Sequence, residues 1–438
     1  MNYSQMKEFS DMQNGITIKY IYSACIVTKT KDVTILHDPW FTEGIYDGAW
    51  FHYPKIENPF TSIGEVDYIF VSHIHPDHYD SSFIKQYFDR FGVKKIIIAD
   101  HERNHLYKKM CIDGFAPIVL KDDLIIGNTS IKIVPHITGS TSDIDSAIII
   151  KLFHNDNNHC VVNVNDIVFD DAMIAKIKDV AGNIDILLCG FTGAGPYPQT
   201  YFDLNDPQLL IESQKKKISF FERYKKLTSK LNAKVNIPFA GKYILGGKLS
   251  QLNLFRGVAD PIEVLDFDQK AVVLQDNGGE INTESMATAQ TRTYAYRKED
   301  IDAVIRSLED KKMDYERLFC KEELVQLPIK RLLHSASRNA LSMSELDYDY
   351  YYCINLSDGE WAIINANKNS KSPLKFVNNN YQLPIPRSEI LIDQGYLFGL
   401  LTNIYHWNTA EVGSQFYTKR IPNTYDTKAL SFLNFLSV

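Results

Sequence analysis

A short apolar strand that runs directly into a group of metal-binding side chains is the feature that most restricts the fold of this chain. The sequence reads DYIFVS at 67–72 and HIHPDHYD at 73–80. A short apolar run bounded by polar residues is typical of a strand buried on both faces, and such a strand needs helices over its sheet. We therefore expect an α/β fold.

The polar group consists of His73, His75, Asp77 and His78. Because side chains alternate along an extended segment, His73 and His75 point the same way and can bind one divalent metal ion. Asp77 and His78 follow where the chain turns, so they can reach a second position nearby. An isolated histidine is usually a core or surface residue, but three histidines and an aspartate within six residues indicate a metal site.

The patterns along the chain predict two domains. A long helix is expected over 207–231, because Asp206 can cap its start and Pro207 fills its first position. A metal-binding domain is placed at 1–275 and an α+β domain of unknown role at 276–438. Further strands are expected at 16–27, 33–37, 95–99, 146–152, 160–164 and 184–189. The apolar stripe of the long helix is expected to include Ile211, Ile218, Phe221, Leu227 and Leu231.

Charge and cysteine content restrict the partners and the compartment. The 47 Lys and Arg against 54 Asp and Glu give a net charge of −7, which supplies no general basic field for nucleic acid. No apolar run approaches the roughly 18 residues of a membrane-spanning helix, and the first 15 residues lack the apolar core of an export signal. Six scattered cysteines without a C-x-x-C pair are typical of a reducing compartment. We expect a cytoplasmic protein that acts on a small molecule, without a membrane span or nucleic acid.

The H-x-H-x-D-H pattern resembles that of the metallo-β-lactamase superfamily, and the resemblance covers about residues 15–260. It implies an αββα sandwich with a metal site at one sheet edge. His136, in IVPHITGS, sits where the third histidine of the first metal belongs. Asp166, in VVNVND, sits where a metal-bridging aspartate belongs, and Asp38, in LHDPWF, where the superfamily has a supporting aspartate.

Three further segments are similar to the branch that contains CMP-N-acetylneuraminate hydroxylase and the N-acylphosphatidylethanolamine phospholipase D-like enzymes. They are HDPWFTEGIYDGAWFHYP at 37–54, CGFTGAGPYPQTY at 189–201 and NIPFAGKY at 236–243. The hydroxylase also carries a Rieske iron–sulfur domain, which needs paired cysteine and histidine ligands. This sequence has no C-x-H or C-x-x-H, so an oxygenase of this type needs a separate electron-transfer protein.

A second departure from the family concerns the last histidine of the metal site. No histidine lies between His159 and His334, and Phe239 is followed by Ala-Gly-Lys. The second metal position then has only Asp77, His78 and the shared Asp166, unless a histidine of the second domain folds in. Either the second ion is weakly held or the protein works with one. The cofactor is therefore expected to be one or two divalent ions, zinc or iron.

The ligand set predicts how the site works. A metal held by His73, His75 and His136 keeps a position open for water and lowers the pKa of that water to about 7, which yields a bound hydroxide. Asp77 and Asp166 are the catalytic candidates, because they can orient this nucleophile and take its proton. We therefore expect a hydrolase of a polar, anionic small molecule. The alternatives are a diiron oxygenase that resembles the hydroxylase and a non-catalytic member with a degraded site.

Five residues are candidates for substrate binding. The backbone at Gly193 and Gly195 allows close approach, and its N–H groups can face an anion. Tyr197 can supply an aromatic wall, and Lys242 can pair with a negative group. His406 lies in the unusually dense segment IYHWNTAEVGSQFYTKRIP at 404–422.

Overall fold

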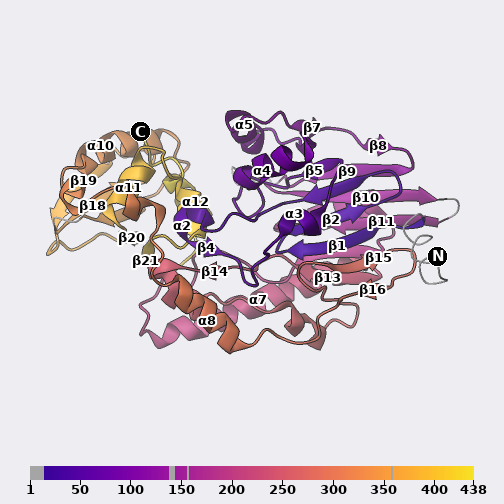
Figure 1. The fold of residues 1–438 in the computed structure, drawn as a ribbon. Helices are drawn as coiled ribbons and strands as arrows, with labels where there is room; N and C mark the ends of the chain where they lie inside the picture. The colour runs from indigo at the N-terminus through magenta and orange to yellow at the C-terminus, as the bar shows by residue number, and fades with distance from the viewer. Residues whose placement is uncertain (1–13, 138–143, 155–156, 357–358) are drawn as a thin grey trace.

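Two β-sheets stacked face to face form the larger part of the molecule (Figure 1). The computed structural model describes residues 14–137, 144–154, 157–356 and 359–438. The first sheet has eight strands. In order across the sheet they are β16 (Thr288–Ala289), β15 (Gly279–Asn282), β1 (Thr17–Tyr22), β2 (Cys25–Lys29), β3 (Thr34–His37), β5 (Tyr68–Phe70), β6 (Lys95–Ala99) and β7 (Ile118–Leu120).

The second sheet has six strands and shares one apolar core with the first. Side chains of both sheets, such as Ile35 from the first and Ile148 and Ile186 from the second, belong to the same buried cluster. In order across the sheet the strands are β13 (Val235–Phe239), β12 (Ile186–Gly190), β11 (Asn157–Asn163), β10 (Ser146–His154), β9 (Thr129–Pro135) and β8 (Leu124–Ile126).

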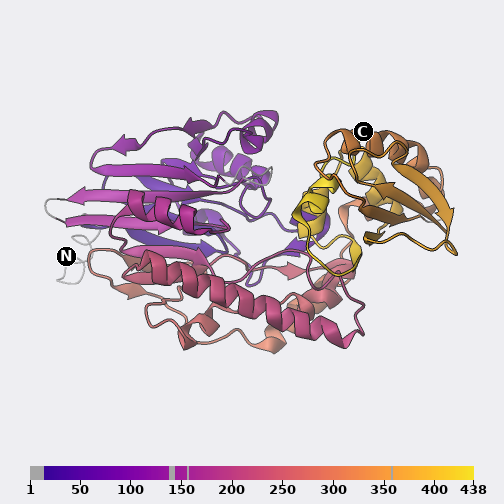
Figure 2. The ribbon, with the colours of Figure 1, turned by 180° about the vertical axis from the view of Figure 1, so that it is seen from behind.

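Helices cover the outer face of each sheet. Phe83 and Leu106 pack against the first sheet from the helices α4 (Ser81–Phe91) and α5 (His105–Ile112). Ile174 and Leu227 pack against the second sheet from α6 (Asp171–Ala181) and α7 (Pro207–Leu231). Figure 2 shows α6 and the long α7 on this side of the molecule. The α/β fold and the αββα sandwich are thereby confirmed.

The C-terminal part builds a separate α+β domain on a five-stranded sheet. Its strands lie in the order β19 (Leu374–Asn378), β18 (Glu360–Asn365), β17 (Tyr351–Asn355), β20 (Arg387–Leu391) and β21 (Tyr417–Ile421). Its helices are α9 (Lys321–Leu324), α10 (Ile329–Ser342), α11 (Gln394–Leu401), α12 (Trp407–Val412) and α13 (Thr427–Leu433). The remaining short elements are α2 (Ile45–Gly48), β4 (Trp50–Phe51), α3 (Pro59–Ile63), β14 (Ile244–Leu245), η1 (Gly247–Phe255), η2 (Pro261–Asp266), α8 (Lys298–Leu308) and η3 (Asp314–Arg317).

The two domains meet at the segment that carries α2 and β4. Both views place α12 beside α2 (Figures 1 and 2). Trp40 and Trp50 of this segment share a buried cluster with Leu333, Tyr396 and Phe432 of the C-terminal domain. The interface is therefore a continuous apolar core.

The first sheet extends further along the chain than residue 275. The strands β15 and β16 follow that residue, and Ile18 of β1 pairs with Ile281 of β15. A division of the chain at residue 275 would separate these two strands from their sheet. Residues 1–13 lie outside the described residues. The expectation that the chain lacks an export signal depends partly on these residues.

The long helix α7 has the predicted bounds but a different buried face. Asp206 caps it by accepting a hydrogen bond from the backbone N–H of Gln208 at 2.8 Å. Leu227 and Leu231 are buried, as expected, whereas Ile211 and Ile218 are exposed. The prediction was wrong for these two because Leu209 and Ser213 face the core instead. Across the described residues, no helix has the length and apolar character needed to cross a bilayer.

Candidate metal centre

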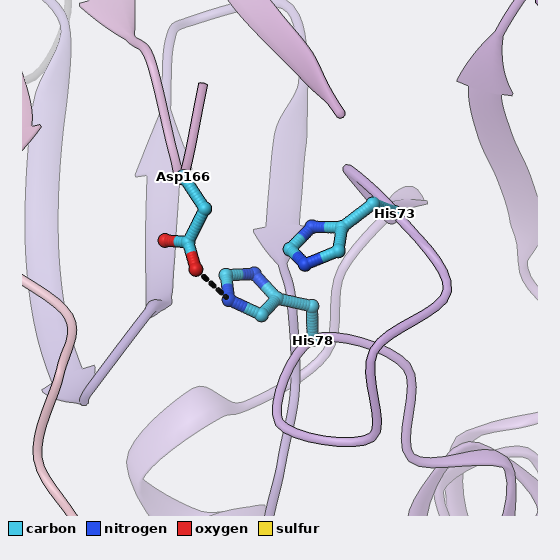
Figure 3. Close-up of side chains that lie close together, drawn as sticks. All are labelled: His73, His78 and Asp166. Carbon is cyan, nitrogen blue, oxygen red and sulfur yellow. Dashed lines mark ion pairs between the residues drawn. The ribbon is translucent and has the colours of Figure 1, made fainter. Parts of the chain in front are cut away.

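The candidate centre forms where strands of the two sheets end on the same side of the sandwich. The loop that holds His73 and His78 joins β5 to α4, and Asp80 caps α4 by accepting from the N–H of Phe83 at 2.9 Å. Asp166 follows β11 of the other sheet. Figure 3 shows these three side chains converging from the two segments. The sandwich thus brings together residues about 90 positions apart in sequence.

The distances within this group suit ligands around a cation. One ring nitrogen each of His73 and His78 and one carboxylate oxygen of Asp166 lie within 4.8 Å of one another. His78 Nε2 lies 3.6 Å from Asp166 Oδ2 and 3.6 Å from Asp77 Oδ2. These separations are longer than hydrogen bonds. They are close to the roughly 3.4 Å between two ligand atoms that each lie about 2.1 Å from a tetrahedral metal.

Asp38 fixes the orientation of the His78 ring through its Nδ1 nitrogen. It is fully buried, its Oδ2 lies 2.9 Å from His78 Nδ1, and it accepts from the N–H and the hydroxyl of Ser72, both at 2.7 Å. With Nδ1 engaged, Nε2 is the nitrogen that remains for a metal. This is the usual arrangement of a metal-binding histidine with an outer carboxylate. The structure thus places Asp38 against His78, and its role as a supporting aspartate stays a prediction.

His73 and His75 form a second half of the centre. His73 Nδ1 lies 3.0 Å from Asp145 Oδ1, and its Nε2 lies 2.9 Å from His75 Nδ1. His75 Nε2 lies 2.9 Å from the Oδ1 of Asn408, a residue of the C-terminal domain. The nitrogens not engaged by Asp145 and Asn408 are therefore His73 Nε2 and His75 Nδ1, which face each other.

Asp145 and Asn408 are neighbours of the centre that sequence reasoning missed. Asp145 directly precedes β10, next to residues 138–143, which lie outside the described residues. Asn408 belongs to the segment 404–422, whose density was a signal, although His406 was the residue chosen there.

His136 is buried beside the centre, and its ligand role stays a prediction. It follows β9, and its backbone N–H donates to the carbonyl of Asp145 at 2.9 Å. Among the residues that the structure describes, the metal-sized group comprises His73, His78 and Asp166 and includes neither His75 nor His136.

The acidic residues of the centre raise the pKa of two buried histidines. Burial favours the neutral form of His78, but the carboxylates of Asp77 and Asp166 outweigh it, so the pKa of His78 lies well above its ordinary value. Burial likewise opposes charge on His73, and Asp145 outweighs it, so the pKa of His73 is also raised. A divalent cation would supply this positive charge and leave the imidazoles neutral.

A cavity of about 570 Å³ opens from the centre. Its lining includes His75, Asp77, Asp145 and Asp166 at one side and residues of α7 at the other. Gly193 and Gly195 also line it. A Cβ at Gly193 would lie 1.9 Å from a ring carbon of Phe220, so the absent side chain makes room for this ring.

The other three substrate-binding candidates contact different partners. The hydroxyl of Tyr197 donates to Glu212 at 2.7 Å. His406 caps α12, because its ring nitrogen Nδ1 accepts from the N–H of Asn408 at 3.3 Å. Lys242 Nζ lies 2.6 Å from a carboxylate oxygen of Asp276; the Asp276 side chain is buried and that of Lys242 is partly buried. The structure does not bring these three to the cavity lining.

Replacement of Lys242 by alanine is expected to destabilise the protein by about 3–5 kcal/mol, because it leaves the carboxylate of Asp276 buried without its cation. Urea denaturation measures this loss. The matched control is Lys248→Ala, since Lys248 pairs with Glu316 at 3.5 Å on the surface and such pairs contribute about 0–1 kcal/mol. An unchanged stability together with a raised KM would instead place Lys242 at the substrate.

Comparison with known proteins agrees with the architecture. Residues 17–197 match the model of a family described as beta-lactamase superfamily domain. The chain is 25% identical over 191 residues to a Mycolicibacterium smegmatis protein named as a candidate Rieske 2Fe-2S iron-sulfur protein, a match that covers 41% of this chain and 34% of that protein. It is 21% identical over 260 residues to the cytidine monophosphate-N-acetylneuraminic acid hydroxylase of Danio rerio, covering 55% and 40%.

A solved structure with a similar fold is a metallo hydrolase from the archaeon Ignicoccus hospitalis. The sequence identity is 18%, the TM-score is 0.41, and the match covers 61% of this chain and 98% of that one. The chain spans only about a third to two fifths of the length of the two curated relatives.

Proposed function

We propose that this protein, whose residues 17–197 match the model of a beta-lactamase superfamily domain, is a metal-dependent hydrolase of a polar, anionic small molecule. The observation that carries the proposal is the group of His73, His78 and Asp166, whose ligand atoms lie within 4.8 Å of one another. Asp166 also lines a cavity of about 570 Å³, so a substrate can reach the group.

The donor set of His73, His78 and Asp166 fits a divalent ion, and we assign His75, whose Nδ1 lies 2.9 Å from His73 Nε2, as the fourth ligand. Such an ion lowers the pKa of water enough for attack on a phosphodiester, ester or amide near neutral pH. Asp77 is the residue that we assign as proton acceptor. Its Oδ1 accepts from the hydroxyl of Tyr46 at 2.5 Å, which fixes the carboxylate, while Asp77 itself lines the cavity.

An oxygenase is the second candidate, favoured by the similarity over 260 residues to the hydroxylase of Danio rerio. The same histidines and carboxylates suit iron. The reaction would draw its electrons from a donor outside these 438 residues, which contain no C-x-H or C-x-x-H for a Rieske cluster.

Metal analysis of protein purified without added metal separates these functions. The hydrolase requires zinc in the protein and cleavage of at least one member of a panel of anionic phosphodiesters, esters and amides. About two irons per chain, a visible absorption band and oxygen consumption with a reductant would replace it with the oxygenase. A site that stays empty when titrated with zinc and iron would leave a non-catalytic protein.

Arg223 is the residue that we expect to select an anionic substrate. It lines the cavity from α7, and its guanidinium carbon lies 5.0 Å from the centroid of the Phe220 ring. Lys226 lines the same wall, but its ammonium group already pairs with Asp171 at 3.0 Å. Among the ion pairs of the described residues, none involves Arg223.

The substitution Arg223→Gln is expected to raise the KM for an anionic substrate about tenfold, with kcat unchanged. The physical reason is the loss of a charge-assisted hydrogen bond, which contributes about 1.5–3 kcal/mol before screening. The control is Lys225→Gln on the same helix, where Lys225 pairs with Glu222 at 2.9 Å outside the cavity lining. Equal effects of the two substitutions would contradict the assignment.

A further inference from the structure

We infer that the C-terminal domain completes the metal centre, with Asn408 as a positioning residue for His75. The inference rests on one part of the proposed function, namely that these histidines bind a metal. It does not depend on which reaction follows.

The hydrogen bond from His75 to Asn408 fixes which ring nitrogen is available. A neutral imidazole carries its proton on one nitrogen and a lone pair on the other. Asn408 Oδ1 lies 2.9 Å from His75 Nε2, and an amide oxygen can only accept, so the proton is on Nε2. The lone pair is then on Nδ1, which lies 2.9 Å from Nε2 of His73, a member of the metal-sized group.

Each of the three histidines has an outer partner beside one of its ring nitrogens. Asp38 lies 2.9 Å from His78 Nδ1, and Asp145 lies 3.0 Å from His73 Nδ1. Both of these partners belong to the first domain. His75 obtains its partner from a residue 333 positions away in the sequence. The first domain thus supplies two of the three outer partners, and the C-terminal domain supplies the third.

The fold of the C-terminal domain holds Asn408 in place. Trp407, the residue before it, is buried, and its indole N–H donates to the carbonyl of Leu436 at 2.8 Å. The His406 side chain accepts from the N–H of Asn408 at 3.3 Å and so caps the start of α12. This gives His406 a role as the cap that sets the position of Asn408.

Contacts further along the interface fix α12 relative to the first domain. Gln415 donates from Nε2 to the carbonyl of Tyr46 at 2.7 Å, and the hydroxyl of Tyr396 donates to Asp47 at 2.6 Å. Tyr46 and Asp47 have φ values of 55° and 61°, a left-handed conformation that costs energy for residues other than glycine. Such a segment persists only when its surroundings hold it, and here the C-terminal domain contributes the contacts.

The zinc affinity of the 438-residue chain, measured by competition with a chromophoric chelator, tests the inference. Asn408→Ala is expected to weaken the zinc Kd about 10–100-fold, the usual effect of losing an outer partner. Asn408→Asp keeps an acceptor oxygen and is expected to stay within about threefold of the wild type. Thr409→Ala, on the same helix, is the control and should bind zinc as the wild type does. The melting temperature of the metal-free protein shows whether each variant is folded.

Two results would overturn the inference. One is a zinc Kd for folded Asn408→Ala equal to that of the wild type. The other is an Asn408→Asp variant that binds as weakly as Asn408→Ala, because the effect would then come from altered packing. A wild-type protein that binds no zinc would overturn both this inference and the metal site. Zinc binding with the expected variant pattern but no hydrolysis would contradict only the hydrolase.

Discussion

Replacement of His75 by alanine is expected to leave a folded protein that retains neither metal nor activity. The substitution removes Nδ1, the ring nitrogen that we assign to the metal, and leaves His73 Nε2 without the neighbour that lies 2.9 Å away. Loss of an outer partner alone weakens metal binding about 10–100-fold, so we expect loss of a direct ligand to exceed about 100-fold. Metal content after dialysis and turnover of the best substrate measure the effect.

The control for this substitution is His105→Ala, because His105 is an exposed histidine at the start of α5. It should keep the metal content and activity of the wild type. Circular dichroism of both variants would show that the fold persists. A His75→Ala protein that retains either its metal or its activity would remove His75 from the centre.

Replacement of Asp38 by alanine is expected to lower both stability and metal affinity. Asp38 is fully buried and accepts from Ser72 twice at 2.7 Å, while its Oδ2 lies 2.9 Å from His78 Nδ1. Removing one partner of a buried charged pair costs about 3–5 kcal/mol in unfolding free energy. The loss of this outer partner of His78 should also weaken the zinc Kd about 10–100-fold.

Urea denaturation and zinc titration separate the two effects of this substitution. Asp67→Ala is the control, since the exposed Asp67 accepts a single hydrogen bond from the N–H of Thr34 at 2.8 Å and should contribute about 1 kcal/mol. A loss of stability in Asp38→Ala without any loss of zinc affinity would make Asp38 a structural residue only.

Local signals in the sequence explain which elements were predictable. The strand 95–99 and the helix 207–231 match β6 and α7, because a short apolar run marks the strand and Asp206 caps the helix. The range 16–27 was expected as one strand but contains β1 and β2. The turn between them uses Ser23 with φ 49°, without the glycine, asparagine or proline that usually marks a turn.

Non-local pairing explains what was not predictable in the fold. The segment 281–293 has no apolar alternation and was treated as following the first domain. It nevertheless contains β16, while Ile281 of β15 pairs with Ile18 across more than 260 residues of sequence. Such pairing depends on the folded sandwich and leaves no local pattern.

In the metal centre, too, residues that are close in sequence were predictable and residues brought together by the tertiary fold were not. The motif from His73 to His78 was visible because its ligands are close in sequence. Asp145 and Asn408 reach the centre through the tertiary fold; no local pattern marks Asp145, and the dense segment 404–422 does not indicate which of its residues faces the centre. Lys242 was assigned to the substrate because its partner Asp276, 34 residues away, cannot be identified before the fold is known.

The most direct test of the metal centre is a crystal structure of the 438-residue chain soaked with zinc, with anomalous data collected at the zinc edge. We expect an anomalous peak between the side chains of His73, His78 and Asp166, with His75 as the fourth ligand, about 2.0–2.2 Å from the coordinating atoms. Clear density for these side chains with no peak among them, or with the zinc bound elsewhere, would contradict it.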